Sequence, residues 1–163
     1  MAKWLLMVMV MACSHKSEPP ASGSGAVTAS PTSGKPDCAN IAADAQALFK
    51  APPKPEIKSD SDDTVSCNYS ASGGTMLMIT ISSSADRPQV GANEDYPNKK
   101  KLSAGDSSWS WGSQESVSVT VRAHGHDCMA IYNRPDDHKD EAPELSQDDA
   151  AQKLSALCLH AIR

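Results

Sequence analysis

The feature that most constrains this chain is a short stretch, ESVSVTVRAHG, in which apolar and polar residues alternate. Successive side chains of a β-strand point to opposite faces, so the alternation predicts a strand with one buried and one solvated face. Antiparallel sheets that cover a core on one side contain strands of this kind. The residues expected to face the core are Val117, Val119, Val121 and Ala123, and those expected to face solvent are Ser118, Thr120, Arg122 and His124.

Four further stretches carry strand signals. Residues 64–70 and 75–82 flank the sequence ASGG, and this order predicts a hairpin with a glycine turn. Residues 107–112 form a shorter candidate strand, and residues 128–133 follow the turn-like sequence HGHD. The polar residues 83–106 are expected to form a long loop. Together with the first stretch, these segments predict an antiparallel sheet of four to five strands.

Helical periodicity occurs at both ends of this set of strands. In DCANIAADAQALFKA, apolar residues recur at helical spacing until the sequence PPKP ends the pattern. In SQDDAAQKLSALCLHAIR, Ser146 can cap the helix, and Asp148 and Asp149 lie where the helix dipole favours anions. An apolar stripe follows along one face. The predicted fold class is therefore α+β, with an N-terminal and a C-terminal helix and the sheet between them.

The composition restricts how stable a hydrophobic core can be and which classes of partner the protein can bind. Only 4% of the 163 residues are aromatic, and the formal net charge is −5. A core with few large side chains is marginal, so covalent links are expected. Nucleic acid is not an expected partner, because binding to phosphates favours a basic protein.

The first 36 residues do not fit this domain. Lys3 precedes eight apolar residues, far fewer than the about 20 that a membrane-spanning helix needs. A cation, a short apolar run and the small residue Ala12 follow the order of an export signal. Beyond Cys13, a run rich in Ser, Gly, Pro, Ala and Thr predicts a flexible tether. The alternative is an ordinary buried cysteine on a short helix.

The segment around Cys13 resembles the lipobox of bacterial lipoproteins, with Val10 at the third place before the cysteine and Ala12 directly before it. The resemblance implies cleavage before Cys13, a diacylglyceryl group on its sulfur and acylation of its freed amine. Ser14 implies sorting to the outer membrane, facing the periplasm or the cell surface. The expected organisation is a signal peptide at 1–12, a lipidated cysteine and linker at 13–36, and a globular domain at 37–163.

Four cysteines remain once Cys13 is lipidated, and export favours their pairing. Of the three connectivities that four cysteines allow, sequential pairing is the simplest. It joins Cys38 to Cys67 and Cys128 to Cys158, and each bond closes a loop of about 30 residues, worth about 3–4 kcal/mol. A metal site and catalytic thiols are the rivals, but no C-x-x-C motif occurs.

The layout of the domain is similar to a broad class of small secreted bacterial lipoproteins of unknown function. The similarity consists of the cysteine at the first helix, the strand-and-turn sequence CNYSASGG, the sequence AGDSSWSW and the final helix. It implies a fold of the expected kind and little more. It implies no reaction, because no reaction is established for the class.

Two clusters are candidate sites. His124 and His126, with Asp127 or His138 as a third ligand, could bind Zn²⁺, Cu²⁺ or Ni²⁺, although HGHD is also a sequence typical of a polar turn. Trp109 and Trp111 lie two residues apart on a strand, so they share a face. In the core they would provide bulk, and if exposed they could stack on a sugar or a peptide.

The sequence contains no recognisable catalytic motif. The patterns sought were G-x-S-x-G, H-E-x-x-H, S-x-x-K, the P-loop and G-x-G-x-x-G. The leading hypothesis is a cell-envelope lipoprotein, not an enzyme and without a cofactor, whose domain binds an envelope protein, the wall or a small ligand. The alternatives are a metal-binding lipoprotein that uses His124 and His126, and a hydrolase whose site is assembled from distant residues.

Overall fold

A computed structural model describes residues 41–50, 52–61, 63–71, 74–84, 87–134 and 145–163. The predicted signal peptide, Cys13, the linker and Cys38 lie outside the described residues, as does His138. The predictions made for them therefore stay predictions. Among the described residues, no helix has the length and apolar character that crossing a membrane requires.

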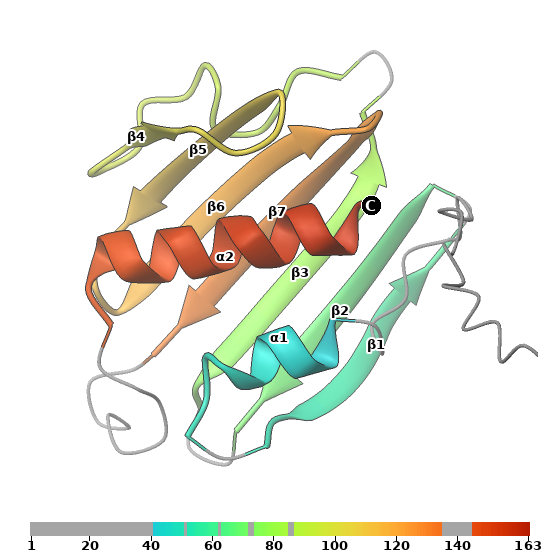
Figure 1. Cartoon of the computed structure of the whole chain (residues 1–163), viewed down its shortest axis with the longest axis vertical. Coiled ribbons are helices and arrows are strands. Elements are labelled where there is room, and N and C mark those ends of the chain that lie inside the picture. Colours follow the sequence, from blue (N-terminus) through green and yellow to red (C-terminus); the bar gives the residue numbers. More distant parts are fainter. Residues whose placement is uncertain (1–40, 51, 62, 72–73, 85–86, 135–144) are drawn as a thin grey trace, which may run out of the picture. The chain divides into compact units, whose positions relative to one another are not determined.

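Seven antiparallel strands form one sheet in the order β1-β2-β3-β7-β6-β5-β4 (Figure 1). The first three strands form one meander and the last four form another, and the two meanders join where β3 pairs with β7. The strands are β1 (Lys54–Asp60), β2 (Thr64–Ser70), β3 (Met76–Ser83), β4 (Lys100–Leu102), β5 (Ser107–Gly112), β6 (Ser116–Ala123) and β7 (His126–Asn133).

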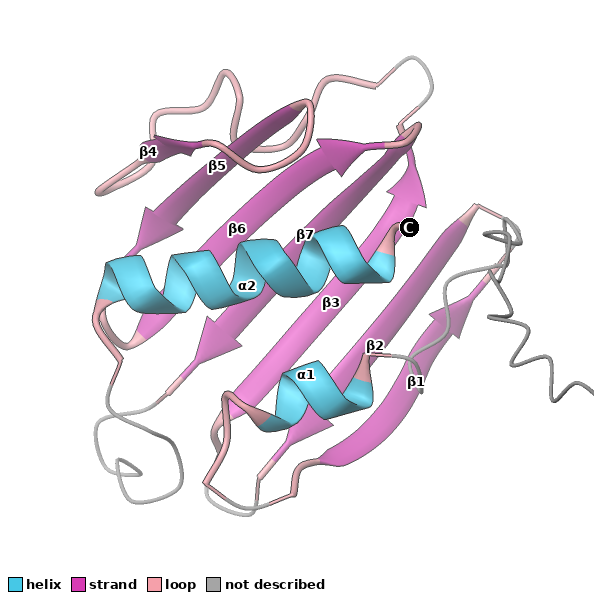
Figure 2. Ribbon diagram, viewed as in Figure 1, coloured by secondary structure: helices cyan, strands magenta, loops and turns pink. Residues whose placement is uncertain are grey.

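Both helices lie on the same face of this sheet (Figure 2). The helix α2 (Gln147–Ala161) packs on β5, β6 and β7, and α1 (Ala42–Gln46) lies over the other half. As predicted, Ser146 caps α2, because its hydroxyl accepts a hydrogen bond from the backbone N–H of Asp149 at 3.1 Å. The α+β class and the packing of the last helix on the buried face are confirmed.

The core lies between this face and the helices. Its strand residues follow the predicted alternation on β6, where the predicted inward-facing residues are all buried. Tyr132 of β7 is 1% exposed, and its hydroxyl donates a hydrogen bond of 3.1 Å to the backbone oxygen of Leu48, which follows α1. The largest buried side chains are Tyr69, Tyr132, Ile41, Leu48, Leu77, Ile79 and Leu154.

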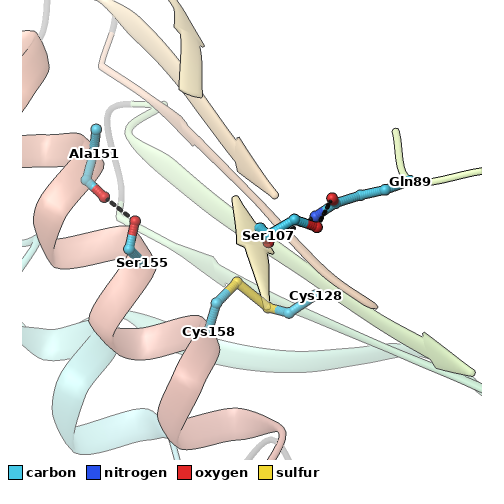
Figure 3. The surroundings of a disulfide bond; sticks show 6 residues. All are labelled: Gln89, Ser107, Cys128, Ala151, Ser155 and Cys158. Carbon is cyan, nitrogen blue, oxygen red and sulfur yellow. Dashed lines mark hydrogen bonds between the residues drawn. A yellow bond between two sulfur atoms is a disulfide. The ribbon is translucent and has the colours of Figure 1, made fainter. Parts of the chain in front are cut away.

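One predicted disulfide is confirmed. Cys128 of β7 and Cys158 of α2 are joined by an S–S bond of 2.05 Å across the core (Figure 3). Cys67 of β2 is 1% exposed and disulfide-bonded. The partner predicted for it, Cys38, lies outside the described part of the chain.

The prediction of four to five strands was wrong, because the sheet also contains β1 and β4. Both are edge strands, and an edge strand needs no alternating apolar face. The strand signal of β1 is weak because the segment contains Pro55 and charged residues. The signal of β4 is weak because two of its three residues are lysines. The first helix is also shorter than the predicted segment: α1 spans five residues.

The prediction of a wet face on β6 was wrong at two positions. The alternation is correct, but Thr120 is 2% exposed and Ser118 is 9% exposed. A segment far from β6 in sequence, residues 87–99, covers this part of the sheet from the side opposite α2. The polar side chains of β6 are therefore buried between the sheet and this segment.

Candidate functional site

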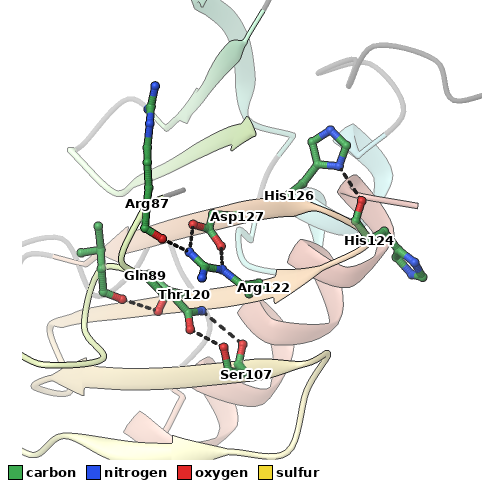
Figure 4. Close-up of polar contacts among 9 residues, drawn as sticks. Arg87, Gln89, Ser107, Thr120, Arg122, His124, His126 and Asp127 are labelled. Atoms are coloured by element: carbon green, nitrogen blue, oxygen red, sulfur yellow. Dashed lines mark hydrogen bonds and ion pairs between the residues drawn. The ribbon is translucent and has the colours of Figure 1, made fainter. Parts of the chain in front are cut away.

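The segment 87–99, called the cover here, is attached to β5 and β6 through polar contacts. Gln89 donates to the backbone oxygen of Ser107 at 3.1 Å, and their side chains are also hydrogen-bonded (Figure 4). Thr120 donates through its hydroxyl to the backbone oxygen of Val90 at 2.9 Å. These contacts explain the burial of Thr120, because its hydroxyl has a backbone partner where water is excluded.

Arg122 attaches the first residue of the cover, Arg87, to β6. Its guanidinium makes two hydrogen bonds of 2.7 Å to the carboxylate of Asp127 and one of 2.8 Å to the backbone oxygen of Arg87. The hydrogen bond that Arg122 donates to Asp127 raises the pKa of Arg122, and partial burial opposes this effect. The bidentate ion pair of Arg122 with Asp127 is partly buried and holds the guanidinium in place. The third hydrogen bond of this guanidinium, to Arg87, therefore fixes the position of the cover's first residues.

Trp111 is sealed by the cover and is 8% exposed. The ring of Tyr96 stacks on it with 4.7 Å between centroids and 14° between planes. Gly91 lies against the same indole, and a Cβ at this position would be 2.5 Å from Cζ3. Trp111 therefore packs in a small cluster outside the main core and has no open face for stacking on a sugar.

Trp109 lies on the same side of β5, as predicted, but it is only partly buried. The ammonium nitrogen of Lys99 is 4.6 Å from the centroid of its ring, and that of Lys101 is 5.9 Å away. Lys99 also donates to the backbone oxygens of Ala92 at 3.0 Å and Glu94 at 2.7 Å. Lys99 is thus fixed by the cover, and Lys101 has no ion-pair partner among the described residues.

A groove opens on the other face of this edge, between α2 and the β4–β5 hairpin. Its volume is about 660 Å³. Half of the residues that line it are apolar and half are polar. They are Leu102, Ala104, Ala156 and Leu159, and Lys101, Ser103, Gln152 and Ser155. The apolar lining and the two lysines of β4 together form a candidate binding surface.

The first two residues of HGHD, His124 and Gly125, form the predicted turn between β6 and β7, and His126 and Asp127 begin β7. His124 has a φ of 53° and Gly125 a φ of 77°, as a two-residue hairpin turn requires. Because His124 leaves the extended conformation, the two rings point in different directions, and the Nδ1 atom of His126 is 3.1 Å from the backbone oxygen of His124 (Figure 4). Asp127 is bound to Arg122.

The described residues therefore bring together no group of three or more His, Cys, Asp or Glu side chains. The proposed ligand pair His124 and His126 gains no third partner within them. The other histidine with a side-chain contact, His160, meets the carboxylate of Asp44 on the exposed surface between the two helices.

No pattern in the sequence predicts the groove. Both tryptophans are recognisable as candidate residues, but nothing in the sequence shows that the cover seals Trp111 and leaves Trp109 partly exposed. The available signal was the run NKKK, whose last two residues are in β4. No known protein family, curated protein or solved structure matches this chain.

Proposed function

We propose that this protein is a cell-envelope lipoprotein, anchored through lipid on Cys13, whose domain binds a partner and catalyses no reaction. The observation that carries the binding function is the groove between α2 and β4. Ligand sites in proteins have volumes of about 300–1,000 Å³ and are mostly apolar with a few polar groups. The groove, at about 660 Å³, lies within that range of volumes, and half of the residues that line it are apolar, among them Leu102 and Leu159.

The shape of the groove favours a macromolecular partner. It is open along one side, so a small molecule in it would stay largely exposed, whereas small-molecule sites enclose most of the ligand surface. Ala156 is exposed and small, which leaves room for a side chain of the partner. An envelope protein is therefore favoured over a small ligand.

The anchor and the second disulfide belong to the same proposal. Acyl chains on Cys13 hold a protein at a membrane with about 0.8 kcal/mol per buried CH₂ group, and the Ser/Gly/Pro-rich linker lets the domain stand away from the surface. Cys38 is the proposed partner of Cys67, which is buried in β2 and disulfide-bonded. Mass spectrometry of peptides from the unreduced protein tests this pairing.

The anchor is tested with Cys13→Ser in cells grown with a labelled fatty acid. We expect the wild-type chain in the membrane fraction with label attached, and the variant in the soluble fraction without label. A variant that remains in membranes and still carries label would show that the lipobox assignment is wrong.

The groove is tested by recovery of partners from envelope extracts with the detergent-solubilised full chain. Ala156→Glu adds bulk and charge inside the groove at an exposed position that the fold tolerates. Lys153→Glu, at an exposed position of α2 that does not line the groove, is the control. We expect a specific partner with the wild type and Lys153→Glu, and its loss with Ala156→Glu. Equal recovery with all three chains would place binding elsewhere.

A further inference from the structure

We infer that the groove receives an extended polypeptide segment with alternating acidic and apolar residues, which pairs with the free edge of β4. The inference rests on the proposed function and names the class of partner. In this mode of recognition, main-chain hydrogen bonds to an edge strand provide affinity, and pockets for alternate side chains provide specificity.

The two edges of the sheet differ in their readiness to pair. The β1 edge contains Pro55, which has no N–H to donate, and its register with β2 shifts between Ile57 and Ser59. Proline and irregular pairing are two of the features that protect edge strands from additional strands. The β4 edge has neither of these and pairs with β5 in regular register; its protection is its short length and its lysines, whose charge an acidic partner neutralises.

The side chains beside β4 specify the pattern of the segment. In an antiparallel pair, residues directly opposite each other share a face. Leu102 faces the helix side, where Ala156 and Leu159 line the groove, so a partner residue on that side would be apolar. Lys101 pairs in register with Trp109 on the other side, so the neighbouring partner residue would meet a cation.

The positive charge of the β4 edge favours an acidic segment as the partner. The edge is cationic although the chain has a net charge of −5. Lys100 lies on the same face as Leu102 and is already paired with Asp148. The cation that remains for a carboxylate of the partner is therefore Lys101, on the other face. A second copy of the chain would place lysines opposite lysines, and like charges directly opposite each other destabilise a strand pair.

The probe is a fluorescent octapeptide of alternating Glu and Val, titrated against the full chain in detergent. One control alternates Lys and Val. The other has the composition of the probe but places its residues in pairs, Glu-Glu-Val-Val, which destroys the alternation. We expect the probe to bind at least about tenfold more tightly than either control, and peptide binding to slow hydrogen exchange at the amides of β4.

Variants locate the site. Lys101→Glu should weaken binding of the Glu-Val probe about tenfold or more, whereas Lys153→Glu, with the same change in net charge, should leave it unchanged. Equal binding of the paired-residue control overturns strand addition. Equal binding of the Lys-Val peptide overturns the acidic class, and concentration-dependent self-association that Lys101→Glu alters identifies a second copy instead.

The two proposals can fail separately. If Ala156→Glu abolishes recovery of an envelope partner while the Glu-Val probe does not bind, the groove is a binding site and the inferred class of partner is wrong. If all variants recover the same partner, the proposed groove function is wrong whatever the peptides do.

Discussion

The sheet is sealed on its two faces over β5 and β6 in different ways. On one face, α2 packs aliphatic side chains against β6 and is joined covalently to β7 through Cys128 and Cys158. On the other face, the cover is held by hydrogen bonds that involve its backbone or the backbone of the sheet, and by one stacked pair of rings. Figure 3 shows the two sides at one place, with the disulfide toward α2 and Gln89 beyond the strands.

The two faces differ in how many contacts share the stabilisation. Many buried aliphatic contacts share the stabilisation on the α2 side, so truncating one side chain leaves most of them in place. On the cover side, each contact is made by a single residue at a defined backbone position. Because α2 belongs to the main hydrophobic core, we expect the loss of its covalent link to affect the whole domain, whereas changes in the cover should have local effects.

The largest effect is expected from removing the disulfide with the double variant Cys128→Ala, Cys158→Ala. The bond spans a sequence separation of 30, so its loss should lower the free energy of unfolding by about 3–4 kcal/mol. Urea denaturation followed by circular dichroism measures the change. A variant with unchanged midpoint and slope would contradict the view that the covalent link stabilises the α2 side.

The second effect is an alkaline loss of stability through Tyr132. Burial raises the pKa of Tyr132 to about 12 from an ordinary value of 10.0, and Arg134 opposes the shift. Because the fold favours the neutral phenol, its contribution is complete below pH 10 and is lost as the pH rises toward 12. The full loss is about 2–3 kcal/mol.

Tyr132→Phe is the matched control for this pH dependence. It removes the ionisation, so the fall in stability between pH 10 and 12 should become smaller than in the wild type. At neutral pH it should cost about 1 kcal/mol, because the hydrogen bond to Leu48 is lost. Identical alkaline profiles for the two chains would show that Tyr132 does not titrate with the fold.

The difference between the two faces also explains which parts of the structure could be predicted from the sequence and which could not. The α2 side was predictable, because the parity of a strand position decides which face it occupies, and α2 carries its own cap and stripe. The cover was not, because Gln89 and Val90 have no periodicity and their partners lie 18 and 30 positions away. The groove could not be predicted for the same reason, because it forms where α2 meets the β4–β5 hairpin and these segments are distant in the sequence.

The third effect is local and tests the cover. Gly91→Ala places a Cβ 2.5 Å from the ring of Trp111 at a φ of 85°, where residues other than glycine are strained. We expect a cost of about 2 kcal/mol, met by displacement of the cover rather than by global unfolding. Hydrogen exchange should accelerate in residues 87–99 and stay slow in β7. Equal acceleration in both would mean that the cover and the core open together.

The smallest effects separate two adjacent lysines. Lys100 makes an exposed ion pair with Asp148, so Lys100→Ala should change the free energy of unfolding by less than about 0.5 kcal/mol, and salt should remove even that. Lys99 instead bridges Trp109 and two backbone oxygens of the cover, so Lys99→Ala should cost about 1 kcal/mol. Only Lys99→Ala should change the tryptophan fluorescence. Equal effects of the two substitutions would mean that Lys99 contributes surface charge alone, and that the cover depends on its other contacts.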